Sequence, residues 1–409
     1  MNTIQLTGGP VMEHQSLLIM LTVGIAIQPA IARAQGSGSP VDIWPARDVT
    51  IAANAKGPRI RIGVWDSGVD TMLFRSQLAR DGQGRALVRG YDAFKQRLDT
   101  PMEVLPPDLI ARRDDLAAIS MGLDDLDSRV DSPAARAVAE KEKTLSRAER
   151  AAEADAVGHW DGYAHGTPVA DITVAGNAQA DIVIARMEWS HGTPPVPCWT
   201  RELAHREAAS IRDLLEFLVA SGARVVNMSW GRYERSYRSN LAQCAPTMPV
   251  EERNALARYS VDTVRAVLQA GMKAAPNVLF VGASGNEGTS VSESNPATRF
   301  SASNFMLIGA VDRAGAKAKF SNSGPEVTLY ANGWRVAGRS PGGMTTFGTG
   351  TSMAAPVVTN AAAKMLAVNP KLTGADLRRI LEQTADTNAA GLRLLHTARA
   401  VEAARAAGR

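Results

Sequence analysis

The chain has 409 residues, 45% of them hydrophobic and 21% charged, which is enough to bury a large core in one large α/β domain or two smaller ones. Its 45 lysine and arginine residues and 41 aspartate and glutamate residues give a net charge of +4, and the basic residues are scattered along the sequence. Because there is no basic block and no interleaving of basic with aromatic residues, nucleic acid is excluded as an expected partner.

The first predicted element is an apolar run near the N-terminus. It extends from Leu17 to Ile27 and is followed by Pro29 and by Ala32-Arg33-Ala34, the small-x-small form of a signal-peptidase site. The run is too short to span a bilayer, so we expect no permanent transmembrane anchor. Residues 1–34 are therefore predicted to be a cleaved signal peptide, and the protein to be exported, periplasmic or secreted. No lysine or arginine precedes the run, which leaves a disordered or membrane-apposed tail as the alternative.

A connector and a first strand follow. Residues 35–58 are rich in glycine, proline, serine and alanine, which is typical of a connector. From Arg59 onward, apolar residues alternate between Ile60 and Val64 and lead to Asp66 and the turn Ser67-Gly68. This pattern predicts a strand that ends in a carboxylate.

Short apolar strands then alternate with helical stretches, which indicates a mostly parallel sheet covered by helices on both faces. The predicted strands are Asp181 to Met187, Ala223 to Met228, Val278 to Gly282 and Met306 to Val311. The predicted helices include Glu202 to Ala220 and Val250 to Gly271.

A helical insertion is predicted at about residues 103–157. Apolar residues recur there at spacings near three, four and seven, between Pro106-Pro107 and Ser132-Pro133; they are Leu109, Leu116, Ile119, Leu123, Leu126 and Val130. Ser132 can cap a second helix that begins at Pro133 and extends through Ala156. We expect a helical hairpin, which is either a solvated surface decoration or a lid or partner-binding surface.

The sequence has only two cysteines, Cys198 and Cys244, each near a proline in a segment that resembles a loop. Export would place them in an oxidising compartment. A disulfide between them would contribute roughly 4 kcal/mol on the loop-entropy model. Two free thiols are the alternative.

One stretch has the composition of a loop that presents a nucleophile. Gly348-Thr349-Gly350-Thr351-Ser352-Met353-Ala354-Ala355-Pro356 combines a glycine-flexible loop, a serine and small residues that can begin a helix. A serine hydroxyl is a weak nucleophile, so this hypothesis also requires a base, an orienting carboxylate and a donor to the oxyanion.

The base must be chosen among six histidines: His14, His159, His165, His191, His205 and His396. Two of them begin identical tetrapeptides, His165-Gly166-Thr167-Pro168 and His191-Gly192-Thr193-Pro194. The residues after Pro168, up to Gly176, can form a short helix, whereas Pro194, Pro195 and Pro197 forbid one. We therefore predict that His165 is the base and that His191 lies in a loop.

These motifs together resemble the subtilisin-like (subtilase) serine protease family over most of residues 59–405. Asp66-Ser67-Gly68-Val69-Asp70 resembles the aspartate motif of that family, His165-Gly166-Thr167 resembles its histidine motif, and Gly350 to Pro356 matches its serine motif residue for residue. Their order is the subtilisin order. The resemblance implies a three-layer subtilisin-like α/β fold for a peptidase domain at residues 59–409, with the helical hairpin inserted into it.

The resemblance also implies the site residues. The catalytic residues would be Asp66, His165 and Ser352, and the oxyanion donor would be Asn286 in Gly282-Ala283-Ser284-Gly285-Asn286. The substrate would pair with the strand at Val226 to Gly231. The walls of the primary specificity pocket would be Ser229, Trp230, Gly231, Ala283, Ser284 and Gly285.

The sequence thus predicts an exported serine endopeptidase that acts on proteins or peptides. No cofactor is required and no metal ligands are predicted. Calcium sites are common in the family, so a structural calcium ion stays open although no acidic cluster forms a calcium loop. The connector at residues 35–58 is too short for the folded prosegment that many relatives carry.

Three other functions are less compatible with the sequence. A catalytically silent protein could bind a partner through the helical hairpin, but it would not require Asp66, His165, Ser352 and Asn286 together. An α/β-hydrolase esterase is disfavoured because Ala354 breaks the Gly-x-Ser-x-Gly motif, and a metalloprotease because the chain has no His-Glu-x-x-His.

Overall fold

The computed structural model of the protein describes residues 41–55, 57–188, 196–294 and 300–408. The predicted signal peptide at residues 1–34, the start of the connector at residues 35–40 and the histidine His191 lie outside the described residues. No helix within the described ranges is long and apolar enough to cross a membrane.

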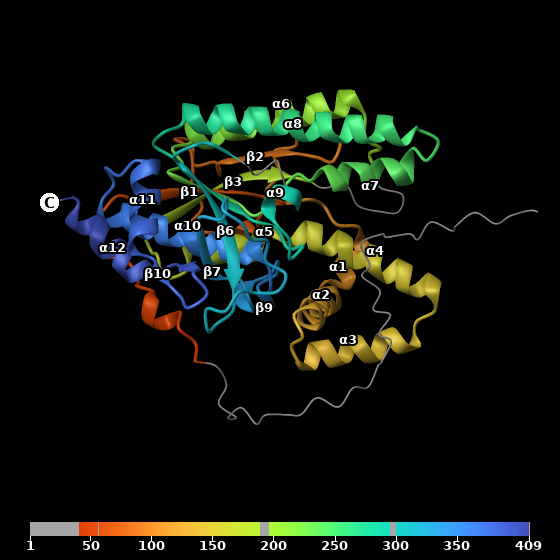
Figure 1. Cartoon of the computed structure of the whole chain (residues 1–409), viewed down its shortest axis with the longest axis horizontal. Helices are drawn as coiled ribbons and strands as arrows, with labels where there is room; N and C mark the ends of the chain where they lie inside the picture. Colours follow the sequence, from red (N-terminus) through yellow and green to blue (C-terminus); the bar gives the residue numbers. More distant parts are fainter. Residues whose placement is uncertain (1–40, 56, 189–195, 295–299, 409) are drawn as a thin grey trace, which may run out of the picture. The chain divides into compact units, whose positions relative to one another are not determined.

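In the described part of the chain, nine strands form one sheet in the order β10-β11-β7-β6-β5-β4-β1-β3-β2 (Figure 1). Neighbouring strands are parallel except β10 and β11. The strands are β1 (Ile60–Asp66), β2 (Val88–Tyr91), β3 (Ala180–Met187), β4 (Val225–Met228), β5 (Leu279–Ala283), β6 (Phe305–Val311), β7 (Leu329–Asn332), β10 (Asp386–Thr387) and β11 (Arg393–Leu394). A separate antiparallel hairpin consists of β8 (Val336–Arg339) and β9 (Thr345–Gly348).

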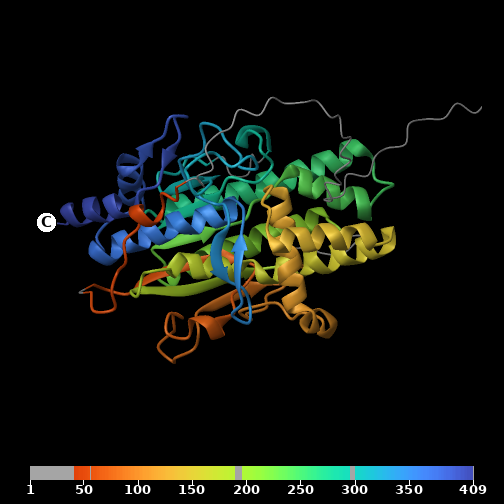
Figure 2. The ribbon, with the colours of Figure 1, turned by 90° about the horizontal axis from the view of Figure 1, so that it is seen from below.

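Helices cover both faces of this sheet (Figure 1 and Figure 2). On one face, a core of aliphatic side chains joins the sheet to α5 (Gly166–Val174), α10 (Thr351–Val368), α11 (Gly374–Thr384) and α12 (Thr397–Ala406). On the other face, a second core joins it to α6 (Arg201–Ala220) and α8 (Val250–Ala274). Burial on both faces explains why the inner strands are continuously apolar.

The predicted class, a mostly parallel sheet between two helical layers, is confirmed. Five strands and two helices begin within two residues of their predicted positions. Strands β2 and β7 were not predicted. Each has four residues and depends on pairing with a longer neighbour, β3 or β6, which a local pattern does not reveal.

Between β2 and α5 lie four further helices: α1 (Pro107–Ala111), α2 (Arg113–Asp127), α3 (Pro133–Thr144) and α4 (Arg147–Ala164). The predicted second helix through Ala156 is wrong in one respect, because it is two helices. Ser146 accepts a hydrogen bond from the Glu149 amide while Glu149 reaches back to the Ser146 amide, and this capping box starts α4 anew. The four helices share their own core, with Leu116, Val138 and Trp160 buried in it.

Helix α2 is attached to the segment that precedes Ser352. The Thr349 amide donates to Asp124 Oδ2 at 3.2 Å, and the buried Asp125 forms an ion pair with Arg335. The Arg335 amide in turn donates to Thr349 Oγ1 at 3.1 Å. These contacts show that α2 is a fixed neighbour of the serine loop.

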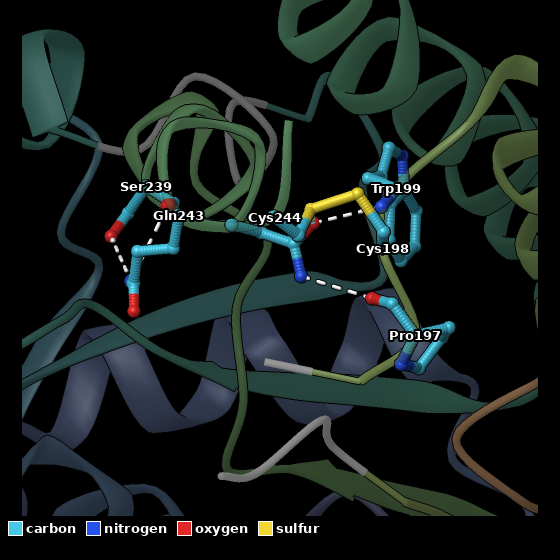
Figure 3. Close-up of a disulfide and its surroundings, with 7 residues drawn as sticks. Pro197, Cys198, Trp199, Ser239, Gln243 and Cys244 are labelled. Atoms are coloured by element: carbon cyan, nitrogen blue, oxygen red, sulfur yellow. Dashed lines mark hydrogen bonds between the residues drawn. A yellow bond between two sulfur atoms is a disulfide. The ribbon is translucent and has the colours of Figure 1, made fainter. Parts of the chain in front are cut away.

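Cys198 and Cys244 are joined by a disulfide with a Cα–Cα distance of 5.6 Å (Figure 3). Cys244 is the last residue of α7 (Glu234–Cys244), so the prediction that it lies in a loop is wrong. Asn240 on the same helix accepts a hydrogen bond from the Trp199 amide and donates one to the Pro197 carbonyl. The chain around Cys198 is therefore held to α7 on both sides of the bridge.

Replacing Asp125 by alanine is expected to lower the free energy of unfolding by about 3 kcal/mol, because it leaves the Arg335 charge without its buried partner. Asp131→Ala is a matched control in the same segment, since Asp131 pairs with Arg136 at 2.5 Å but is 82% exposed. That change should stay within about 0.5 kcal/mol. Urea unfolding followed by circular dichroism measures both, and equal losses would contradict the attachment of α2.

Candidate active site

Asp66 is the last residue of β1, a central strand of the sheet. Sites in open parallel sheets lie outside the carboxyl ends of the strands, which is where β1 delivers this carboxylate. Asp66 is only 1% exposed, and its Oδ1 accepts hydrogen bonds from the Ser67 amide and from His165 Nδ1, both at 2.8 Å. The carboxylate is therefore fixed in one orientation.

His165 lies at the junction between α4 and α5. The neighbouring Gly166 makes the close approach to β1 feasible, because a Cβ at this position would lie 2.2 Å from the Gly68 carbonyl oxygen. The Gly166 amide donates to Ser67 Oγ at 3.1 Å. Nδ1 is directed at Asp66, so Nε2 is the ring nitrogen on the opposite side of the imidazole.

The charges around His165 favour its protonated form. Burial alone would lower the pKa of His165, but the charge and hydrogen bond of Asp66, followed by the charges of Asp161 and Asp124, outweigh it and hold the pKa above its ordinary value. Asp161 comes from α4 and Asp124 from α2. The helical segment thus contributes to the electrostatics of this histidine.

Ser352 is in the first turn of α10, and Pro356 of the same motif leaves the Ser352 carbonyl without its usual helical donor. In a regular helix, the amide of residue 356 would donate to the Ser352 carbonyl, but Pro356 has no N–H. Ser229 Oγ supplies the missing donor at 2.7 Å, and Ser352 Oγ lies 3.4 Å from the Ser229 carbonyl oxygen. The end of β4 and the start of α10 are joined in this way.

Asn286 is held by the residue before the serine. Its Oδ1 accepts hydrogen bonds from Thr351 N at 2.9 Å and from Thr351 Oγ1 at 2.8 Å. Two donors on one oxygen assign the other side-chain atom as Nδ2. Because Asn286 lines the pocket described next, its NH₂ group is available to a ligand there.

A pocket with a volume of about 310 Å³ brings these groups together. Its lining residues are Asp161, Gly162, His165, Ser229, Trp230, Gly231, Tyr233, Ala283, Gly285, Asn286, Thr351 and Ser352. Asp66 lies behind His165, buried beneath the pocket.

Five of the six predicted substrate-binding residues line the pocket: Ser229, Trp230, Gly231, Ala283 and Gly285. Ser284 does not. It is fully buried and its Oγ donates to the Asn322 carbonyl at 3.3 Å, because successive side chains of an extended segment point to opposite sides. The Trp230 ring packs edge-on against Trp65, with centroids 5.0 Å apart, which fixes its place in the wall.

Four lining residues are not among the predicted ones: Asp161, Gly162, Tyr233 and Thr351. A signal for Asp161 was present, since the capping box at Ser146 and Glu149 predicts a helix that continues toward His165. Position 161 is one helical turn before that histidine. Tyr233 carries no such signal, as it follows a strand end in a loop.

Among the described residues, no three histidine, cysteine, aspartate or glutamate side chains are grouped so that they could hold a metal ion.

The chain is similar to known serine proteases. The model of the subtilase family matches residues 57–400. A subtilisin from Bacillus pumilus is 38% identical over 108 residues, which is 26% of this chain and 39% of that protein. A cell wall-associated protease from Bacillus subtilis is 36% identical over 110 residues, covering 27% of this chain and 12% of that protein. The chain thus aligns with less than half the length of these relatives.

Two solved structures share the fold. A structure on the assembly of subtilase cytotoxin has a TM-score of 0.52 at 17% identity, covering 87% of this chain and 92% of that chain. The A-subunit of an AB5 toxin from E. coli has a TM-score of 0.51 at 17% identity, covering 86% of this chain and 94% of that chain. The predicted subtilisin-like form of the α/β fold is confirmed.

The imidazole of His165 is expected to titrate with a pKa above the ordinary value of 6.5, which an NMR titration of the histidine signals measures. The Asp161→Asn variant should move that pKa downward, because it removes one of the negative charges that stabilise the imidazolium. Asp155→Asn makes the same change about 9 Å further from His165 along α4, at 1.5 Å per residue, and should leave the titration unchanged. A His165 pKa below 6.5, or one insensitive to Asp161, would contradict this electrostatic account.

Proposed function

The chain belongs to the subtilase family, and on that premise we propose that it is an exported serine endopeptidase. Asp66, His165 and Ser352 form its catalytic triad, and Asn286 is its oxyanion donor. The observation that supports this most directly is the hydrogen bond from His165 Nδ1 to the buried Asp66, since His165 also lines one pocket with Ser352 and Asn286.

The proposed reaction begins at Ser352. His165 Nε2 accepts the proton of the Ser352 hydroxyl as Oγ attacks the carbonyl carbon of the scissile bond. His165 then donates this proton to the leaving amine, and a water molecule releases the acyl group by the same route. Asp66 holds the imidazole in the required tautomer and stabilises the imidazolium, in keeping with the direction of the His165 pKa.

Two donors are proposed for the tetrahedral oxyanion. One is Asn286 Nδ2, which the two hydrogen bonds on Oδ1 orient. The other is the Ser352 amide. Of the first amides of α10, Thr351 N donates to Asn286, while Met353 N and Ala354 N donate to the Gly350 carbonyl, which leaves Ser352 N for a ligand. The positive end of the helix dipole favours an anion at this place.

This chemistry uses side chains and backbone amides, and we propose no cofactor for it. The partners are protein or peptide substrates. The segment α1–α4 supports a role at the cleft more than one as a surface for a partner, because Asp161 lines the pocket and α2 contacts the serine loop.

The proposal predicts that a fluorophosphonate modifies the purified protein at Ser352, with identification by mass spectrometry of the labelled peptide. Ser352→Ala should abolish labelling and reduce casein cleavage below detection, because loss of the nucleophile costs about 10⁶-fold in a subtilisin. Ser236→Ala, which changes an exposed serine on α7, should retain both activities. A folded wild-type protein that is neither labelled nor active would favour the catalytically silent binding protein instead.

Export is proposed from the apolar run at Leu17 to Ile27 and the site at Ala32-Arg33-Ala34. The disulfide between Cys198 and Cys244 also suits an oxidising compartment. After expression of the full chain in a bacterium, N-terminal sequencing of the protein from the periplasm or medium should begin at Gln35. Recovery from the cytosol with an intact N-terminus would contradict export.

A further inference from the structure

The pocket wall on the His165 side carries a carboxylate that the triad does not use. Asp161 is in the last turn of α4, is exposed, and lines the pocket together with His165 and Ser352. The pocket has no lysine or arginine among its described lining residues. The charge that this wall presents to a ligand is therefore negative.

The carboxylate is oriented by one hydrogen bond, and its recorded charge interaction is with His165. Ser120 Oγ on α2 donates to Asp161 Oδ1 at 2.6 Å. Within the described residues, no lysine or arginine forms an ion pair with Asp161 and no donor is recorded for Oδ2. One carboxylate oxygen is thus held by α2, and the other can receive a hydrogen bond from a ligand.

Two neighbouring features increase the negative potential here. Asp124 lies on the adjacent helix α2, and burial raises its pKa to about 7, so it is partly ionised at neutral pH. The carbonyl end of α4 is also at the pocket, since Gly162 lines it. The Gly166 amide, which would donate to the Gly162 carbonyl in an unbroken helix, donates to Ser67 Oγ instead. The carbonyl end of a helix carries a partial negative charge, which attracts cations.

His165 carries no charge in the form that starts the proposed reaction. Its Nδ1 is committed to Asp66, and in the proposed reaction the imidazole is neutral when substrate binds. Partial desolvation also raises the pKa of Asp161, so the carboxylate gains most from a ligand that brings its own cation and hydrogen-bond donors. Lysine and arginine side chains are the peptide groups with this chemistry.

We propose that Asp161 gives this site a preference for substrates with a lysine or arginine at a particular position. This position is next to the substrate residue whose side chain lies between Ser229–Gly231 and Ala283–Gly285. The basic side chain would lie against α4, on the His165 side of the pocket, and donate to Asp161 Oδ2. This inference rests on the proposed peptidase function and specifies its substrate class. It assigns to the helical segment a part in selecting substrates.

The test compares internally quenched peptides that share the substrate residue whose side chain lies between Ser229–Gly231 and Ala283–Gly285. They differ only at the two positions flanking that residue, which are arginine, norleucine or glutamate. The ratio of kcat/KM for the arginine and norleucine peptides, measured on one enzyme preparation, cancels any general change in activity. The wild-type ratio is expected to be at least about tenfold, the effect of one charge-assisted hydrogen bond. It should fall as salt is raised, because screening weakens the charge interaction.

The variants separate charge at the wall from charge elsewhere. Asp161→Asn should lower the ratio about tenfold, through KM more than through kcat, and Asp161→Lys should favour the glutamate peptide. Asp155→Asn removes the same charge from an exposed position on α4 outside the pocket, and should leave the ratio at the wild-type value.

A wild-type enzyme that is labelled by a fluorophosphonate and cleaves all three peptides equally would overturn this inference and leave the peptidase function standing. So would an arginine preference that Asp161→Asn does not reduce, or that Asp155→Asn reduces equally. A protein that is neither labelled nor active on any peptide would overturn the peptidase function, and this inference with it.

Discussion

The hydrogen bond between His165 Nδ1 and the buried Asp66 is the contact on which the site depends. It joins the carboxyl end of β1 to the junction of α4 and α5, two places 99 positions apart in the chain. The contact requires a central strand to deliver the carboxylate and a glycine, Gly166, to let the helix turn approach the Gly68 carbonyl. The sheet, α4 and α5 together therefore hold His165 Nδ1 and Asp66 Oδ1 2.8 Å apart.

The remaining site residues are fixed by exchanges of hydrogen bonds between segments. Pro356 removes a donor from the first turns of α10, and Ser229 replaces it. Thr351 uses its amide and hydroxyl to orient Asn286, and α2 holds the loop before Ser352 through Asp124 and Thr349. Each of these contacts pairs a backbone or side-chain polar group at the serine loop with a partner from another segment, so the same contacts give the loop its geometry and contribute to its stability.

Local sequence was sufficient to single out residues that the structure brings to one site. Asp66 ends an alternating apolar strand, Ser352 follows two glycines, and prolines after His191 favoured His165. Local sequence was insufficient where tertiary packing determines the direction in which a side chain points. Ser284 is predicted in the pocket wall but points into the core. For Asp161, the capping box predicts the helix α4, but nothing local shows that this helix turns Asp161 toward the cleft. The break between α3 and α4 is visible in the sequence as a capping box at Ser146 and Glu149, so the prediction of one continuous helix there misread an available signal.

The most direct test of the account is a crystal structure of the protein after reaction with a peptidyl chloromethyl ketone that carries arginine next to the reactive residue. The account predicts covalent bonds from Ser352 Oγ to the former carbonyl carbon and from His165 Nε2 to the methylene carbon. It also predicts Asn286 Nδ2 within about 3 Å of the resulting oxygen, and the arginine against Asp161. Attachment at another residue, or an oxygen directed away from Asn286 and the Ser352 amide, would contradict the assignment of this pocket as the catalytic site.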